Sequence, residues 1–140
     1  MKKTLICSIS IVMVLLLCLV SCNTVDKEGL WEEATYRRDT TVGKGDTTVE
    51  LKVTAGDDSI VITVKTDEKM LGDALLESGI VEGDKEIYGL YVKKVNGIRA
   101  DYNLDKAYWQ LIVNGKSSLV GVDFVEITEG DTYEFVYTEA

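Results

Sequence analysis

Residues 47–66 read TTVELKVTAGDDSIVITVKT, two runs of alternating apolar residues separated by a short polar segment. Val49, Leu51 and Val53 alternate with polar residues, which is the period of a β-strand that buries one face. The same alternation resumes after AGDD at residues 55–58, whose glycine and aspartates favour a turn. Two alternating runs joined by a short turn predict a β-hairpin.

The period changes after the hairpin. In TDEKMLGDALLESG, residues 66–79, the apolar residues fall at helical spacing. We expect Thr66 or Asp67 to cap the first turn, and Gly79 to end the helix in a left-handed conformation. Gly72 lowers helix stability by about 1 kcal/mol relative to alanine, so we expect it to permit close packing on the sheet.

Three later segments predict further strands: YGLYVKKVNG (88–97), AYWQLIVNG (107–115) and DTYEFVYT (131–138). The first two end in Asn-Gly, a strong hairpin-turn signal. A hairpin, one helix and then more strands predict an α+β fold, specifically a β-grasp or a related α+β roll. We therefore assign residues 47–140 to one domain.

The first 21 residues have the pattern of a secretory signal peptide. Lys2 and Lys3 precede the apolar run TLICSISIVMVLLLCLV. The sequence LVSC at residues 19–22 resembles a bacterial lipobox, which implies cleavage before Cys22 and attachment of a diacylglycerol to its thiol. We expect a protein anchored by lipid on the outer face of a bacterial cell membrane. The alternative is an uncleaved transmembrane anchor.

Residues 22–46 connect this anchor to the domain. A short polar tether, NTVDKEG, follows the lipidated cysteine. The next residues, LWEEATYRRDTTVGKG (30–45), are too apolar for a spacer, so we expect an arm that packs on the domain or adds an edge strand.

Composition excludes several functions. Without Lys2 and Lys3 the chain has 13 basic and 24 acidic residues, a net charge of −11. Such a surface repels nucleic acid and anionic lipid, so we expect membrane attachment to come from the diacylglycerol and not from the protein surface. All three cysteines lie in residues 1–22 and there is no histidine. We therefore expect neither an enzyme nor a cofactor or metal site.

An acidic run, DYNLD at residues 101–105, has the spacing that opens an EF-hand calcium loop. The rest of that pattern fails. Lys106 stands where the loop needs glycine, and Ile112 stands where a bidentate glutamate belongs. We expect a solvated turn here.

Several segments together carry a family resemblance. LWEEATY, LGDALLESG, YGLYVKKVNGIRADY, AYWQLIVNG, GVD and EGDTYEFVYT, in this order, resemble the bacterial transcobalamin-like C-terminal domain family. Its members are surface proteins and lipoproteins without an assigned function as a group. The family is named for its similarity to the β-domain of transcobalamin and intrinsic factor, which closes over a corrin ring in those vitamin B12 carriers.

This resemblance implies ligand contacts at Trp109 and, less strongly, at Leu90, Tyr91 and Leu119. Strand alternation places Trp109 on the more apolar face of its strand, which leaves it either in the core or at the edge of a pocket. Tyr108 lies on the opposite face, where it could belong to a ligand-binding surface. Tyr91 and Tyr108, with Tyr88 and Tyr102, could form a stacking platform.

The loop NGKSSLVG (114–121) carries two apolar residues, Leu119 and Val120. They either contribute to a binding surface or fold back onto the core. The sequence therefore favours a lipid-anchored module that captures or presents a small ligand such as a corrinoid. The alternative is an interaction or structural module for a surface protein, a glycan or a wall component.

Overall fold

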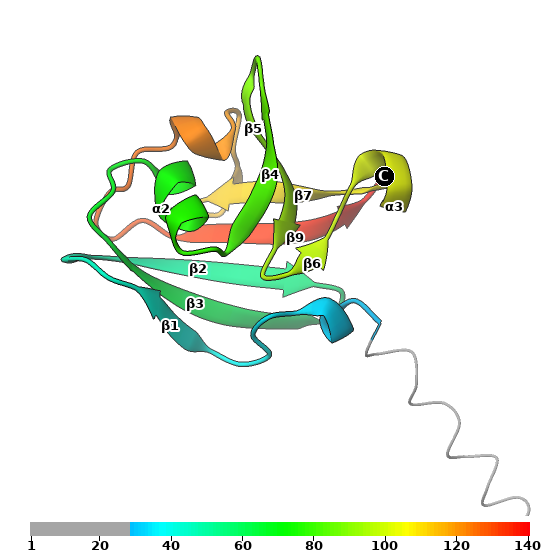
Figure 1. The fold of residues 1–140 in the computed structure, drawn as a ribbon, viewed down its shortest axis with the longest axis horizontal. Coiled ribbons are helices and arrows are strands. Elements are labelled where there is room, and N and C mark those ends of the chain that lie inside the picture. Colours follow the sequence, from blue (N-terminus) through cyan, green and yellow to red (C-terminus); the bar gives the residue numbers. More distant parts are fainter. Residues whose placement is uncertain (1–28) are drawn as a thin grey trace, which may run out of the picture.

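The computed structural model describes residues 29–140, so the predicted signal peptide, Cys22 and most of the tether lie outside the described residues. The described part contains a six-stranded sheet in the order β1-β3-β2-β9-β7-β8 and a three-stranded sheet in the order β4-β5-β6 (Figure 1). The strands of the larger sheet are β1 (Thr40–Gly43), β2 (Thr47–Ala55), β3 (Asp58–Thr66), β7 (Ala107–Val113), β8 (Lys116–Ser117) and β9 (Tyr133–Glu139).

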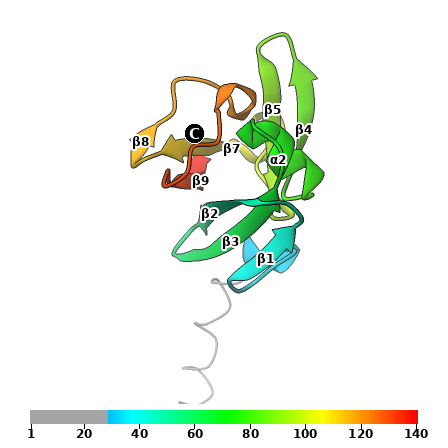
Figure 2. The same cartoon turned by 90° about the vertical axis from the view of Figure 1, so that its left-hand side faces the viewer.

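The remaining elements lie between the strands of the larger sheet in sequence. The smaller sheet consists of β4 (Val81–Glu86), β5 (Gly89–Val95) and β6 (Ile98–Arg99). The helices are α2 (Leu71–Glu77) and α3 (Tyr102–Asp105), with 3-10 turns η2 (Trp31–Glu33) and η3 (Val122–Phe124). Helix α2 and the smaller sheet lie on one side of the larger sheet (Figures 1 and 2). The fold is α+β, as predicted.

The predicted hairpin forms the centre of the larger sheet. Strands β2 and β3 pair antiparallel with Leu51 opposite Ile62, and the inward residues of both strands are buried. Strand β9, the last in the chain, pairs parallel with β2 and antiparallel with β7. The Asn-Gly pairs after β5 and β7 have positive φ at all four residues, as their hairpin turns require.

Helix α2 begins at Leu71, later than the predicted capping residues Thr66 and Asp67. The segment before the helix is held by another part of the chain, because Met70 forms an isolated β-bridge with Glu126. The end of the helix is as predicted, since Gly79 has a φ of +72°. Gly72 was expected to pack closely on the sheet, and this was wrong. The glycine packs against Asp123 of η3.

The segment before the hairpin packs on the domain and also supplies an edge strand. Strand β1 pairs parallel with β3. Further back, the buried side-chain amide of Asn96 accepts a hydrogen bond from the backbone N–H of Tyr36 at 2.9 Å and donates one to its carbonyl at 2.8 Å. These contacts hold residues 30–43 on the domain.

One hydrophobic core joins the two sheets and α2. Its largest fully buried side chains come from β2, β3, β9, α2 and β6: Leu51, Ile62, Phe135, Leu71, Leu75 and Ile98. The rigid body formed around this core carries the exposed loops described below. Within residues 29–140, no helix has the length and apolar character needed to cross a membrane.

Candidate functional site

Trp109 is a core residue. Its side chain is 7% exposed, and its indole N–H donates to the carbonyl of Ile98 at 3.1 Å. The indole meets the rings of Phe135 and Tyr137 edge-on, with centroids 6.4 and 5.6 Å away. The polar atom of the indole is therefore satisfied inside the protein. Leu90, another residue implied by the resemblance, is also buried.

The other three predicted contact residues are exposed. Tyr108 lies on the face of β7 opposite Trp109, as the strand alternation predicted, and is 38% exposed. Tyr91 projects from the outer face of β5, where the Lys93 ammonium lies 5.8 Å from its ring centroid. Leu119 is fully exposed in the loop after β8.

The four tyrosines proposed as a platform are all exposed, but they come from separate parts of the fold. Tyr91 and Tyr108 belong to β5 and β7, Tyr102 begins α3, and Tyr88 lies at the turn between β4 and β5. In the described part of the chain, the paired aromatic rings are those of Trp109 with Phe135 and Tyr137. The tyrosines therefore form no mutual stack there.

A different group of exposed apolar residues lies on two segments that touch each other. Two segments supply it: the turn between β4 and β5, and the stretch from the β8 loop through η3. We call this group the apolar ridge, and its members are Ile87, Tyr88, Leu119, Val120 and Phe124. Three of them are exposed by more than 80%: Leu119, Ile87 and Tyr88. In Figure 2 the chain after β8 arches across the molecule to η3, which lies beside β5.

The two segments of the ridge touch at Gly89 and Phe124. A β-carbon on Gly89 would lie 2.9 Å from Cε2 of Phe124, and the φ of Gly89 is +103°. A side chain here would displace the phenyl ring and would also strain the backbone. Glycine at this position therefore lets the turn and η3 lie in contact.

Asp123 fixes the same junction with a hydrogen bond. Its Oδ2 accepts from the backbone N–H of Leu90 at 2.9 Å, and Lys85 Nζ lies 3.9 Å from this oxygen. Its Oδ1 is buried with no hydrogen-bond partner among the described residues and faces Gly72 of α2. One carboxylate thus contacts the helix, the small sheet and η3 together.

Part of this ridge could be predicted from the sequence. Leu119 and Val120 were considered for a binding surface, and they do not fold back onto the core. Ile87 and Phe124 were missed. A signal for Ile87 was available, since two large apolar residues directly before Gly89 occupy a hairpin turn, where polar residues are usual.

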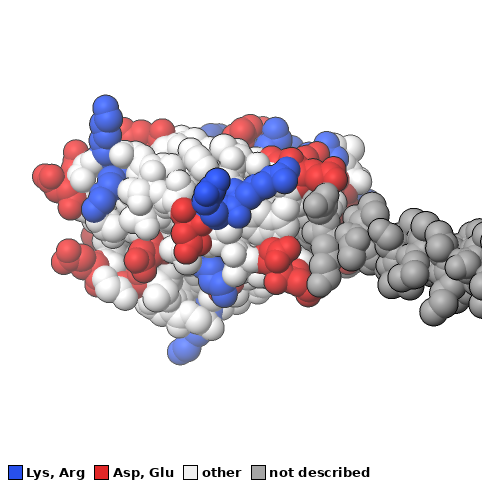
Figure 3. Space-filling model, turned by 90° about the horizontal axis from the view of Figure 1, so that it is seen from below, with Lys and Arg blue, Asp and Glu red and all other residues white. Residues whose placement is uncertain are grey.

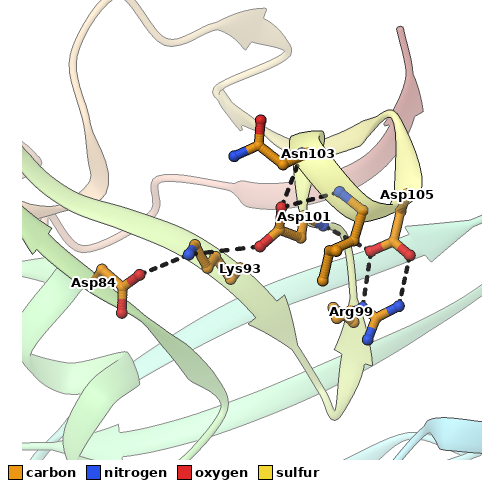
Figure 4. Close-up of polar contacts among 7 residues, drawn as sticks. Asp84, Lys93, Arg99, Asp101, Asn103 and Asp105 are labelled. Carbon is orange, nitrogen blue, oxygen red and sulfur yellow. Dashed lines mark hydrogen bonds and ion pairs between the residues drawn. The ribbon is translucent and has the colours of Figure 1, made fainter.

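An ionic cluster lies at the other end of the small sheet, around α3 (Figure 4). Lys93 lies between Asp84 at 2.6 Å and Asp101 at 3.5 Å, and Arg99 binds both oxygens of Asp105 at 2.8 and 2.9 Å. Asp101 also caps α3 by accepting from the backbone N–H groups of Asn103 and Leu104. These carboxylates are engaged by protein donors.

The pKa values follow from these contacts. The guanidinium of Arg99 and the backbone N–H of Asp101 lower the pKa of Asp105 to about 2. Burial raises the pKa of Asp101, but the α3 N–H groups and Lys93 outweigh it, so its pKa falls below the ordinary value. The expectation of a solvated turn at residues 101–105 was therefore wrong, because Asp101 caps helix α3 and both aspartates form ion pairs. In residues 29–140, no three His, Cys, Asp or Glu side chains are placed to share a metal ion.

Residues 68–139, slightly more than half of the chain, match a family described as "Domain of unknown function (DUF4430)". The match runs from the residues before α2 to the last strand, so it includes the apolar ridge, Trp109 and the ionic cluster. No curated protein sequence is significantly similar to this chain.

Two solved structures are similar to this chain to different degrees. A protein of Ruminococcus gnavus ATCC 29149, provisionally described as a metal binding protein, is 26% identical with a TM-score of 0.62. The similarity covers 68% of this chain and 99% of that one. Haptocorrin in complex with Cbi is 15% identical with a TM-score of 0.48, over 66% of this chain and 25% of haptocorrin. The sequence match shows a family without an assigned function, as the resemblance implied.

Proposed function

The chain belongs to the family described as "Domain of unknown function (DUF4430)", and we propose that it is a lipid-anchored, non-enzymatic binding module outside the cell. Its β-grasp-like domain captures or presents a small ligand at the apolar ridge. A corrinoid is the most specific candidate. The observation that carries the proposal is the exposure of five large apolar side chains on two touching segments.

The energetics of the ridge support a binding role. Leaving a large apolar side chain in water forgoes about 1.5–3 kcal/mol relative to burying it. Single exposed apolar residues are ordinary, but a contiguous group marks an interaction site. The two segments of the ridge are joined by the hydrogen bond from Leu90 to Asp123 and by the contact of Gly89 with Phe124. A preformed surface loses less entropy when a ligand binds.

The class of ligand follows from the shape and chemistry of the ridge. Exposed aromatic and aliphatic groups suit a ligand with an apolar face, such as a corrin ring. The sequence resemblance to the β-domain of vitamin B12 carriers favours the same class. Those carriers hold much of the ligand with a separate helical domain, so we expect modest affinity unless a partner completes the site.

The absence of histidine adds a chemical constraint. With no imidazole anywhere in the sequence, the chain has no side chain of this kind to ligate a corrinoid cobalt. Binding therefore relies on contact with the ring and its substituents. A bound-state absorption spectrum should match that of the free corrinoid in water, and a spectrum of axial histidine ligation would contradict this.

The location is part of the proposal. The lipobox-like sequence ending at Cys22 supports lipid attachment on the outer face of a bacterial cell membrane. Palmitate labelling of the expressing cells tests this point. We expect label in the wild-type chain and none in Cys22→Ser, in which all remaining residues of the signal sequence are unchanged.

Isothermal titration of the full chain in detergent with cobinamide and with cobalamin tests the ligand. We expect saturable heat with the wild type. The affinity should be about tenfold or more lower in the double variant Tyr88→Ser/Phe124→Ser, which removes two aromatic contacts. The matched control is Tyr102→Ser/Leu104→Ser, which removes two exposed apolar side chains of α3 outside the ridge. No heat at high micromolar corrinoid would overturn the corrinoid proposal.

The alternative function is an interaction or structural module for a surface protein, a glycan or a wall component. The projecting turn between β4 and β5 favours a protein partner, because Ile87 and Tyr88 at its tip could insert into a groove (Figure 1). Capture of a surface protein by the wild type but not by Tyr88→Ser/Phe124→Ser, without corrinoid binding, would establish this alternative.

A further inference from the structure

Trp31 lies between two cavities at the end of the domain where the arm enters. Each cavity has a volume of about 300 Å³. Both are lined by Trp31 and by Asp58, the first residue of β3. In Figure 1, η2 lies at the bottom of the molecule and the turn between β4 and β5 at the top, so this region is separate from the apolar ridge.

The indole of Trp31 is held in place while part of its surface stays accessible. Its N–H donates to the carbonyl of Ala55 at 2.9 Å, at the end of β2. The side chain is partly buried against the core and also forms a wall of both cavities. An aromatic ring fixed in this way offers a ready surface on which a ligand can pack.

Polar groups of both kinds surround the indole. Asp57 and Asp58, at the hairpin turn, supply carboxylate acceptors, and within residues 29–140 neither side chain makes a hydrogen bond or ion pair. Arg37 lines the second cavity and supplies guanidinium donors, one of which reaches the carbonyl of Glu32 at 3.2 Å. Figure 3, which views the molecule from below, shows positive and negative side chains intermixed on this face.

We propose that Trp31, Arg37, Asp57 and Asp58 form a carbohydrate-binding site. The C–H face of a sugar ring is apolar and packs on an indole, while its hydroxyls both donate and accept hydrogen bonds. The carboxylates accept from these hydroxyls and the guanidinium donates to them. Each cavity is at the lower end of the size range of small-molecule sites, so two adjoining cavities suit neighbouring units of an oligosaccharide.

The charges disfavour other ligand classes. Two carboxylates repel phosphates and other anions. A quaternary ammonium ligand is usually enclosed by several aromatic rings, whereas one indole lines these cavities and Arg37 repels a cation. A neutral polyhydroxyl ligand can pack on the indole and form hydrogen bonds with the two carboxylates and the guanidinium. The site lies outside the part of the chain matched by the family and does not depend on the function of the ridge.

Two-dimensional ¹H–¹⁵N NMR of the full chain in detergent tests the site. The chain has two tryptophans, so the indole N–H of Trp109, buried in the core, is an internal control. We use N-acetylglucosamine tetramer and maltotetraose as probes. The Trp31 indole and the backbone amides of residues 56–59 should shift with saturation in at least one titration, while the Trp109 indole stays unchanged.

Two variants complete the test. Asp57→Asn/Asp58→Asn preserves side-chain shape and should weaken sugar binding about tenfold, because charged acceptors form stronger hydrogen bonds than amides. Asp73→Asn, an exposed aspartate on α2, is the control and should bind as the wild type does. No shift with either probe at millimolar concentration, shifts that persist unchanged in the double variant, or a response to choline alone would overturn the proposal. None of these results bears on corrinoid binding at the ridge.

Discussion

The carboxylate of Asp123 accepts a hydrogen bond from the backbone N–H of Leu90 at 2.9 Å, and this bond joins the two segments of the apolar ridge. Replacing Asp123 with alanine removes the acceptor and leaves the Leu90 N–H without its partner. We expect a loss of about 1–2 kcal/mol in the free energy of unfolding, measured by urea denaturation. Corrinoid affinity should fall as well, because the ridge becomes mobile.

Asp123→Asn is the matched variant for this prediction. The amide oxygen can still accept from Leu90, so the segments should stay joined and most of the stability should remain. If alanine and asparagine reduced stability equally, the hydrogen bond to Leu90 would not be the important interaction of Asp123.

Gly72 supports the same junction from α2. A β-carbon at this position would approach Cα and N of Asp123 to 3.0 and 3.1 Å, and backbone atoms cannot rotate away. Gly72→Ala normally stabilises a helix by about 1 kcal/mol, but here we expect a net destabilisation of about 1–3 kcal/mol. Thermal unfolding checks this against Asp73→Ala, the neighbouring exposed position, which should change little. Stabilisation by Gly72→Ala would contradict the observed packing.

Trp109 should affect stability and not binding. Trp109→Phe keeps an aromatic ring but removes the N–H that donates to Ile98, so we expect a loss of about 1–3 kcal/mol. Calorimetric unfolding measures this loss. At a temperature where the variant is fully folded, its corrinoid affinity should equal that of the wild type. A selective loss of affinity in the folded variant would show that Trp109 contacts the ligand.

The Arg99–Asp105 ion pair predicts a stability change in acid. The pKa of Asp105 is about 2 in the folded protein, below its ordinary value of 3.8. Because the folded pKa is lowered, the stabilisation is complete above about pH 4 and is lost as the pH falls towards 2. Arg99→Gln should raise the pKa of Asp105 towards 3.8, measured by NMR titration of the carboxyl carbon. An unchanged pKa in Arg99→Gln would contradict this origin.

The parts of the fold that depend on residues close together in the sequence could be predicted. The β2–β3 hairpin follows from the alternation of residues 47–66, and Asn96-Gly97 adopts the positive φ values that its turn needs. The start of α2 could not be predicted, because Met70 pairs with Glu126, far away in the sequence. A long-range pairing of this kind overrides local capping signals.

The candidate site was harder to predict for a related reason. Strand alternation placed Trp109 and Tyr108 on opposite faces, but it could not show that the carbonyl of Ile98 lies within reach of the indole. The place of Ile87 in a hairpin turn was a signal of exposure, but apolar residues in loops usually cover a core, so Phe124 gave little indication of it. The meeting of the two segments that carry these residues depends on the contact of η3 with β5, which is a tertiary feature.

Mapping corrinoid contacts by ¹H–¹⁵N NMR tests whether the apolar ridge is the ligand site. The full chain in detergent is titrated with cobinamide while all assigned amides of residues 29–140 are followed. We predict saturable shifts concentrated at residues 87, 88 and 119–124, with the Trp109 indole N–H unchanged. The absence of shifts at these residues, or shifts confined to another surface, would contradict the assignment of the apolar ridge as the ligand site.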